Sequence, residues 1–228
     1  MTVAYNPSCV TNGLVLYLDA GNIKSYPGSG TTWTDLSGNG NTGTLVNGPT
    51  YDSANGGSLV FDGSNNYVST SNIANNLSAF TVSCVFKTNY SGIQFLVAKL
   101  VNYSSGAGWG LFLNSGSIRF ILQENGSNWG VYYTATGYAN NLWHHATAVI
   151  TGGLLSAMYV DGVAIGTTLV TGTAWTSYSN TVQVRVGTDA APEFFFKGNI
   201  SLPQVFTRAL SATEILQNFS ALRGRFGL

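Results

Sequence analysis

The chain has 228 residues, of which 44% are hydrophobic, 13% aromatic and only 8% charged. Because ordinary soluble domains carry about a quarter charged residues, this composition is a poor match for a cytosolic enzyme. Nine basic and nine acidic residues give a net charge of zero, and no basic stripe is visible, which argues against nucleic acid as a partner. No apolar run approaches the roughly 20 residues needed to span a bilayer, so we expect no membrane insertion.

Taken in order, the chain begins with a leader at residues 1–13, which we expect to dock to a neighbouring protein. Residues 14–228 then form a single domain with no linker and no shift in composition. Short runs in which apolar residues alternate with other residues, each bounded by turn-forming residues, predict strands. These runs are 14–19, 43–46, 58–61, 67–69, 80–87, 94–99, 110–114, 117–124 and 129–134. The strands at 58–61 and 67–69 are joined across a hairpin signal, Asp62-Gly63-Ser64-Asn65.

Residues 142–162 predict the central hairpin, with a joint at Gly152-Gly153 and a tight turn at Asp161-Gly162. Neither face of its first strand is cleanly polar, so we expect cover on both sides. Adjacent His144 and His145 point to opposite faces of a strand. They cannot act together on one substrate, and hydrogen-bonded structural roles are the better interpretation. Further strands are expected up to about residue 168, at 182–186 and at 199–206.

The single helix signal lies near the end of the chain. Ser211 and Glu214 form a capping box, and apolar residues follow at helical spacing, which predicts a helix at about 211–222. About 13 strands and one short helix indicate an all-β fold, an antiparallel two-sheet jelly-roll sandwich. Cys84 lies in an apolar run typical of a buried thiol, and spacing alone leaves a bond between Cys9 and Cys84 undecided.

Three segments, in order, resemble the laminin G-like, concanavalin A-like lectin/glucanase jelly-roll family. The first is Leu16-Tyr-Leu-Asp19, leading to Asp35-Leu-Ser-Gly-Asn-Gly-Asn and Leu45. The second runs from Ser58 through Asp62-Gly63 to Tyr67-Val68. The third is Trp143-His-His145 through Tyr159-Val-Asp161-Gly162, followed by Gly198-Asn-Ile200 and Arg208-Ala-Leu-Ser211 with Glu214-Ile215. The resemblance implies a concanavalin A-like sandwich of two curved antiparallel sheets, and it leaves the function open.

Glucanases of this fold use two acidic residues on one strand, which flank the bond that is cleaved. This chain has three glutamates, Glu124, Glu193 and Glu214, far apart in sequence, and Glu214 is explained as a helix cap. Asp189 and Glu193 are four apart, but Pro192 between them indicates a loop. We therefore expect no enzymatic activity and no catalytic residues.

A calcium ion is the cofactor that the sequence leaves open. Asp35, Asn39 and Asn41 place oxygen ligands at alternate positions before and after Gly40, as in the first half of a calcium-binding loop. The twelfth position is Val46, so the bidentate carboxylate is missing. The alternative is that these side chains hold a tight glycine-rich turn.

Aromatic and amide side chains suited to a sugar gather between residues 103 and 138. Sugars stack on exposed aromatic rings and hydrogen-bond to amides. The candidate ligand-binding residues are Tyr103, Trp109, Asn125, Asn128, Trp129 and Tyr132, with core packing as the alternative for the two tryptophans.

Two functions compete. The first is implied by the resemblance, because the family is common in appendage and decoration proteins of tailed bacteriophages. It is a structural protein of a tailed-bacteriophage virion, either capsid decoration or a tail-fibre module, with other virion proteins and itself as partners in a homo-oligomer. It is favoured by the low charge, by the zero net charge and by an N-terminus that lacks the basic and apolar regions of a secretory signal. The alternative is a lectin-like adhesion module that binds surface glycans, located outside the cell or at its surface.

Overall fold

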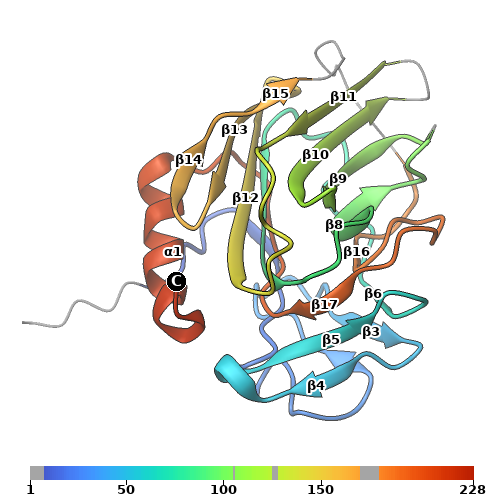
Figure 1. Ribbon diagram of the computed structural model, residues 1–228, viewed down its shortest axis with the longest axis vertical. Coiled ribbons are helices and arrows are strands. Elements are labelled where there is room, and N and C mark those ends of the chain that lie inside the picture. The colour runs from blue at the N-terminus through green and yellow to red at the C-terminus, as the bar shows by residue number, and fades with distance from the viewer. Residues whose placement is uncertain (1–7, 105, 125–127, 170–179) are drawn as a thin grey trace, which may run out of the picture.

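The computed structural model describes residues 8–104, 106–124, 128–169 and 180–228, without the side chains of Asn128, Trp129, Tyr133 and Leu169. Two antiparallel sheets face each other, and one helix lies against the outside of the first sheet (Figure 1). The predicted all-β, two-sheet sandwich is confirmed. No helix in the described part is long and apolar enough to cross a membrane.

The first sheet draws its strands from both halves of the chain. From edge to edge it contains β14 (Val163–Ile165), β13 (Leu154–Val160), β12 (Trp143–Thr151), β7 (Phe80–Lys87), β17 (Lys197–Ile200), β5 (Ser58–Asp62) and β4 (Thr50–Asp52). β18 (Gln204–Phe206) also pairs with β7, and β1 (Leu14–Tyr17) pairs with β18. A short 3-10 helix, η1 (Ala54–Gly56), separates β4 from β5.

The second sheet is built largely from consecutive hairpins. Its order is β15 (Thr168–Leu169), β11 (Asn128–Tyr133), β10 (Ser117–Glu124), β9 (Gly108–Asn114), β8 (Gln94–Leu100), β16 (Arg185–Val186), β6 (Tyr67–Ser69), β3 (Gly43–Val46) and β2 (Thr32–Trp33). Neighbours in sequence pair directly from β8 to β11, which short turns between the strands allow.

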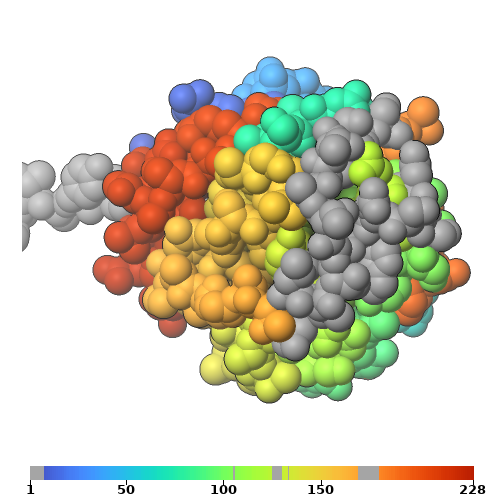
Figure 2. Space-filling model, turned by 90° about the horizontal axis from the view of Figure 1, so that it is seen from above, coloured from blue at the N-terminus to red at the C-terminus, as the bar shows by residue number. Residues whose placement is uncertain are grey.

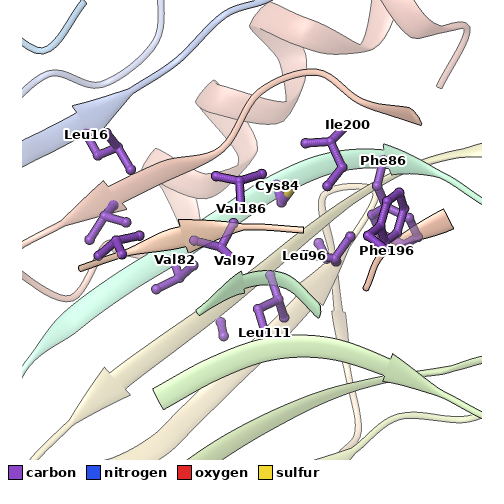
Figure 3. Close-up of a cluster of buried hydrophobic side chains, with 14 of the residues drawn as sticks. Leu16, Val82, Cys84, Phe86, Leu96, Val97, Leu111, Val186, Phe196 and Ile200 are labelled. Carbon is purple, nitrogen blue, oxygen red and sulfur yellow. The ribbon is translucent and has the colours of Figure 1, made fainter. Parts of the chain in front are cut away.

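The main core fills the space between the sheets. Strand alternation brings Phe80, Val82, Cys84 and Phe86 of β7 into it. Side chains from both sheets meet there, as Figure 3 shows for Leu16, Val82, Cys84, Phe86, Leu96, Val97, Leu111, Val186, Phe196 and Ile200. Both cysteines are free: Cys84 is in this core, and Cys9 packs against a different cluster under the helix.

The helix, α1 (Ala212–Phe226), covers the outer face of the central hairpin (Figure 2). Its apolar face includes Phe219, which stacks on the ring of His145, and Phe226, whose ring lies 4.9 Å from that of Trp143. β12 is therefore buried along all but its last residue, so the expected cover on both faces is confirmed.

The predicted capping box is present at the start of α1. Ser211 Oγ accepts the N–H of Glu214, and the Glu214 carboxylate accepts the N–H of Ser211. The helix extends to Phe226, four residues beyond the predicted end, and Gly227 ends it in the left-handed conformation with φ of 71°. Arg208 pairs with Glu214 at 2.6 Å, and these contacts lower the pKa of the Glu214 carboxyl to about 2.

The C-terminal strand prediction was wrong in detail. Residues 199–206 form two strands rather than one, with Ser201, Leu202 and Pro203 between them. Pro203 has no N–H to donate to a ladder, which explains the break. Of residues 182–186, only Arg185 and Val186 are in a strand.

The end of the predicted leader packs on its own chain. The N–H of Val10 donates to the Asn218 side chain of α1 at 2.7 Å, and Gln217 donates to the Ser8 carbonyl. Ser8 and Val10 thus contact the helix, and the carbonyls of Asn12 and Gly13 accept hydrogen bonds from Arg208 and Thr207 just before it. The earlier part of the leader lies outside the described residues. Docking of that part to a neighbour stays a prediction.

Candidate functional site

A surface hollow of about 380 Å³ lies where β7 ends and β12 begins. Lys87 and Trp143 pair across these two strands and form part of its lining. The other lining residues come from η1, from the residues around the start of β12, from the turn after β13 and from the end of α1: Asn55, Asn141, Leu142, His144, Asp161, Phe226, Gly227 and Leu228. We call this the β12 hollow. Its volume falls within the roughly 300–1,000 Å³ typical of small-molecule sites.

A histidine–aspartate pair forms the polar wall of the β12 hollow. His144 Nδ1 lies 2.8 Å from Asp161 Oδ2, and the other Asp161 oxygen accepts the backbone N–H of His145 at 2.7 Å. His144 Nε2 lies 3.2 Å from Asn140 Oδ1, and the same oxygen accepts a hydrogen bond from the Leu142 N–H. Both ring nitrogens therefore lie within hydrogen-bond distance of a side-chain oxygen.

The predicted hydrogen-bonded role of His144 is confirmed, and its main partner is distant in sequence. Asp161 is 17 positions away in sequence, but the hairpin turn brings it back to the start of β12. His145 instead faces the helix, where burial lowers its pKa to about 4 against the opposing effect of Asp161. Its ring is neutral near pH 7 and serves as a packing surface for Phe219.

Two hydrogen-bond donors in the β12 hollow lack a partner among the described residues. Lys87 Nζ makes no ion pair there, and it lies over the Trp143 ring at 5.3 Å. Trp143 Nε1 is buried and unpaired. Exposed Asn55 and Asn141 and the 62% exposed Leu142 line the same hollow. The hollow thus offers charge, N–H groups and apolar surface to a ligand.

A second, smaller hollow of about 190 Å³ lies in the region where the sequence predicted a sugar site. It is lined by Tyr103, Ser104, Ile121 and Gln123. Tyr103 packs edge-on against Phe95, Phe112 and Phe194, in a cluster separate from the main core. This hollow is smaller than the usual range for ligand sites.

The structure does not bring the predicted ligand-binding residues to one surface. Trp109 is fully buried in the main core, and Tyr132 belongs to the same core with 7% exposure. Their assignment as sugar-stacking rings was wrong, because no ring face is open to a ligand. Asn125 and the side chains of Asn128 and Trp129 lie outside the described residues. Of the six, Tyr103 alone lines a described hollow.

The predicted calcium loop is instead a hydrogen-bonded turn. One oxygen of Asp35 accepts the N–H groups of Tyr17 and Ser37, and the other accepts the Ser37 hydroxyl and the Asn41 N–H. Four accepted bonds fill the roughly four acceptor sites of a carboxylate. Asn39 and Asn41 donate to the carbonyls of Leu14 and Val15. All three residues therefore attach the loop to β1.

A family model described as the concanavalin A-like lectin/glucanases superfamily matches residues 62–216. The chain belongs to the concanavalin A-like lectin/glucanase superfamily. The match covers both strands that frame the β12 hollow and the paired His144 and Asp161. No curated protein matches the chain by sequence.

Solved structures with the same fold include toxin binding domains. The binding domain of Paraclostridial Mosquitocidal Protein 1 superposes with a TM-score of 0.71 at 15% identity, over 92% of this chain and 52% of that one. The binding domain of botulinum neurotoxin DC, in complex with rat synaptotagmin II, superposes with a TM-score of 0.70 at 15% identity, over 93% of this chain and 52% of that one. A third structure comes from work on botulinum neurotoxin type C, whose cell entry is described as dependent on two ganglioside molecules. It superposes with a TM-score of 0.70 at 16% identity, over 93% of this chain and 52% of that one. The chain spans about half the length of these structures.

Within the superfamily, cleavage of a sugar bond calls for two carboxyl groups that flank it. The lining of the β12 hollow includes a single acidic side chain, Asp161, and each of its oxygens has a hydrogen-bond partner. Asp189, which is near Glu193, is buried and accepts the N–H of Tyr103, so it holds a loop in place. Glu214 is used by the helix cap. The geometry at the β12 hollow therefore suits binding better than hydrolysis.

Proposed function

We propose that this protein is a non-enzymatic, lectin-like module that binds a glycan in the β12 hollow. The observation that carries the proposal is the combination of hydrogen-bond donors and an apolar side chain in one hollow of ligand size. Lys87 Nζ has no partner among the described residues, exposed Asn55 and Asn141 carry amide donors, and Leu142, which is 62% exposed, lines the same hollow. A sugar presents hydroxyl oxygens to such donors and C–H faces to such apolar surface.

Ligands named for several of the superposed toxin binding domains support the proposal. One structure is described as botulinum neurotoxin DC with a sialylated sugar, and another description names gangliosides. Those ligands belong to those proteins, and the low identity limits the comparison to the fold. The β12 hollow itself is the basis for placing a glycan on this chain.

A glycan array probed with the wild-type protein and paired variants tests the proposal. Leu142→Ala removes an exposed apolar contact, and Asn141→Gly removes an amide at a residue with φ of 64°, a conformation that glycine adopts freely. Leu216→Ala and Asn76→Gly make the same changes at exposed positions outside the hollow, with φ of 52° at Asn76. We expect the first two variants to lose binding and the controls to keep it.

The proposal fails if the wild-type protein binds no glycan, or if Leu142→Ala and Asn141→Gly bind as strongly as wild type. Trp129→Ala provides the competing test. Its backbone pairs with Gln123, which lines the smaller hollow. If Trp129→Ala abolishes binding while the β12 variants do not, the glycan site lies in the region that the sequence first indicated.

A structural role in a tailed-phage virion, as capsid decoration or a tail-fibre module, is the second candidate. The 8% charged residues and zero net charge favour it, because weak net repulsion favours association with other copies. Light scattering after size exclusion tests the homo-oligomer that it implies. A defined oligomer is expected, and a monomer at all concentrations would count against this role.

A further inference from the structure

We infer that the β12 hollow selects an acidic sugar and places its carboxylate or sulfate group at Lys87. This inference rests on the proposed function, and it adds a chemical class of ligand and a specificity-determining residue. It follows from which polar groups in the hollow are already paired and which are not.

The one acidic side chain of the hollow already has partners. Asp161 is its acidic side chain, and its two oxygens contact His144 Nδ1 at 2.8 Å and the His145 N–H at 2.7 Å. Asn140 Oδ1, next to the hollow, likewise faces His144 Nε2 and accepts the Leu142 N–H. The negative charge of Asp161 is therefore held against His144, while the charge of Lys87 has no such partner among the described residues.

The donors of the hollow are not satisfied. Lys87 Nζ has neither an ion-pair partner nor a hydrogen bond among the described residues, although three donor hydrogens are available. Trp143 Nε1 is a second unpaired donor, in a side chain that is 7% exposed. A ligand rich in acceptors would satisfy Lys87 Nζ.

Charge selects among acceptor-rich sugars. Lys87, His144 and Asp161 are the titratable side chains that line the hollow, and Asp161 is held against His144 on the wall. Lys87 is thus the charged side chain of the hollow that has no ion-pair partner among the described residues. A bond between an ammonium and an anionic oxygen is about twice as strong as one between neutral groups. Asn55 and Asn141 supply amides for the hydroxyls of the same ring or of a neighbouring ring.

Matched sugar pairs test the inference across the classes of acidic sugar. The array carries uronic acid oligosaccharides with their carboxyl-reduced forms, sialylated glycans with their desialylated forms, and sulfated glycans with their desulfated forms. We expect the wild-type protein to bind the acidic member of at least one pair about tenfold or more tightly than the neutral member, the worth of one charge-assisted hydrogen bond. Which pair responds distinguishes a carboxylate from a sulfate.

Lys87→Gln is the decisive variant, because it keeps a polar side chain and removes the charge. It should abolish the preference for the acidic sugar, so that both members of each pair bind with similar affinity. Lys24→Gln, at an exposed lysine outside the hollow, should keep the preference. Equal affinity for both members of every pair, or a preference that survives Lys87→Gln, overturns the inference while leaving glycan binding intact. Absence of all glycan binding instead refutes the proposed function, and this inference with it.

Discussion

Arg225 ties the end of α1 to the sandwich, and its removal should destabilise the protein markedly. Its Nη1 lies 2.7 Å from Asp19 Oδ1, and its Nη2 donates to the Gly57 carbonyl at 3.0 Å and to Ser201 Oγ at 2.8 Å. Nε donates to the Asn55 carbonyl at 3.3 Å. Arg225→Met keeps much of the apolar stem but removes all of these donors. Asp19, whose side chain is 10% exposed, is then left without its cation.

The magnitude follows from the burial of the pair. Breaking a buried ion pair from one side costs about 3–5 kcal/mol. The Arg225 side chain is 21% exposed, so solvent screens part of the interaction and we expect the lower end, about 3 kcal/mol. For a chain of this size, each kcal/mol lowers Tm by about 2–4 °C, which gives a fall of roughly 6–12 °C.

Urea unfolding followed by tryptophan fluorescence, together with calorimetry, measures this loss. Arg223→Met is the matched control, because Arg223 lies on the same helix, is exposed and has no ion pair among the described residues. It should change the free energy of unfolding by no more than about 0.5 kcal/mol. If Arg225→Met costs less than about 1 kcal/mol, or no more than Arg223→Met, the assigned role of the Arg225 network is wrong.

Three further predictions concern a pH effect, calcium and the helix cap. Burial raises the pKa of Asp189 to about 7 from 3.8, so stabilisation by its neutral form is lost as pH rises from about 4 to 7. The Tm of Asp189→Asn relative to wild type should therefore rise between pH 4 and pH 8, and a pH-independent difference would contradict this. Millimolar calcium should leave Tm unchanged in scanning fluorimetry, because the Asp35 oxygens are filled, and a rise of several degrees would show a site. Ser211→Ala should cost about 1 kcal/mol in urea unfolding, and no loss would argue against the capping box.

The hairpins were predictable because their signals are local. Asp161-Gly162 and Ser115-Gly116 both adopt positive φ at the turns where the sequence places polar and glycine residues. Alternation along residues 80–87 defined β7 to the residue. By contrast, β2 and β16 have two residues each, too few for a period-2 pattern to appear. Their pairing depends on neighbours distant in sequence.

The site was less predictable, for two reasons. Trp109 belongs to the inward-facing register of β9 with Leu111 and Leu113, and that alternation was a usable signal against an exposed ring. The β12 hollow had no such signal. Lys87 and Phe226 are 139 positions apart by their numbers, and only the packing of α1 on the first sheet brings both to one hollow.

The measurement that tests the central claim most directly is nitrogen–proton NMR of the indole N–H groups during titration with the strongest array ligand. The chain has five tryptophans, so each indole reports on its own surroundings. Glycan binding in the β12 hollow predicts a saturable shift of the Trp143 signal, with the core residues Trp33 and Trp109 unmoved. Saturable binding that leaves the Trp143 signal unchanged would contradict it.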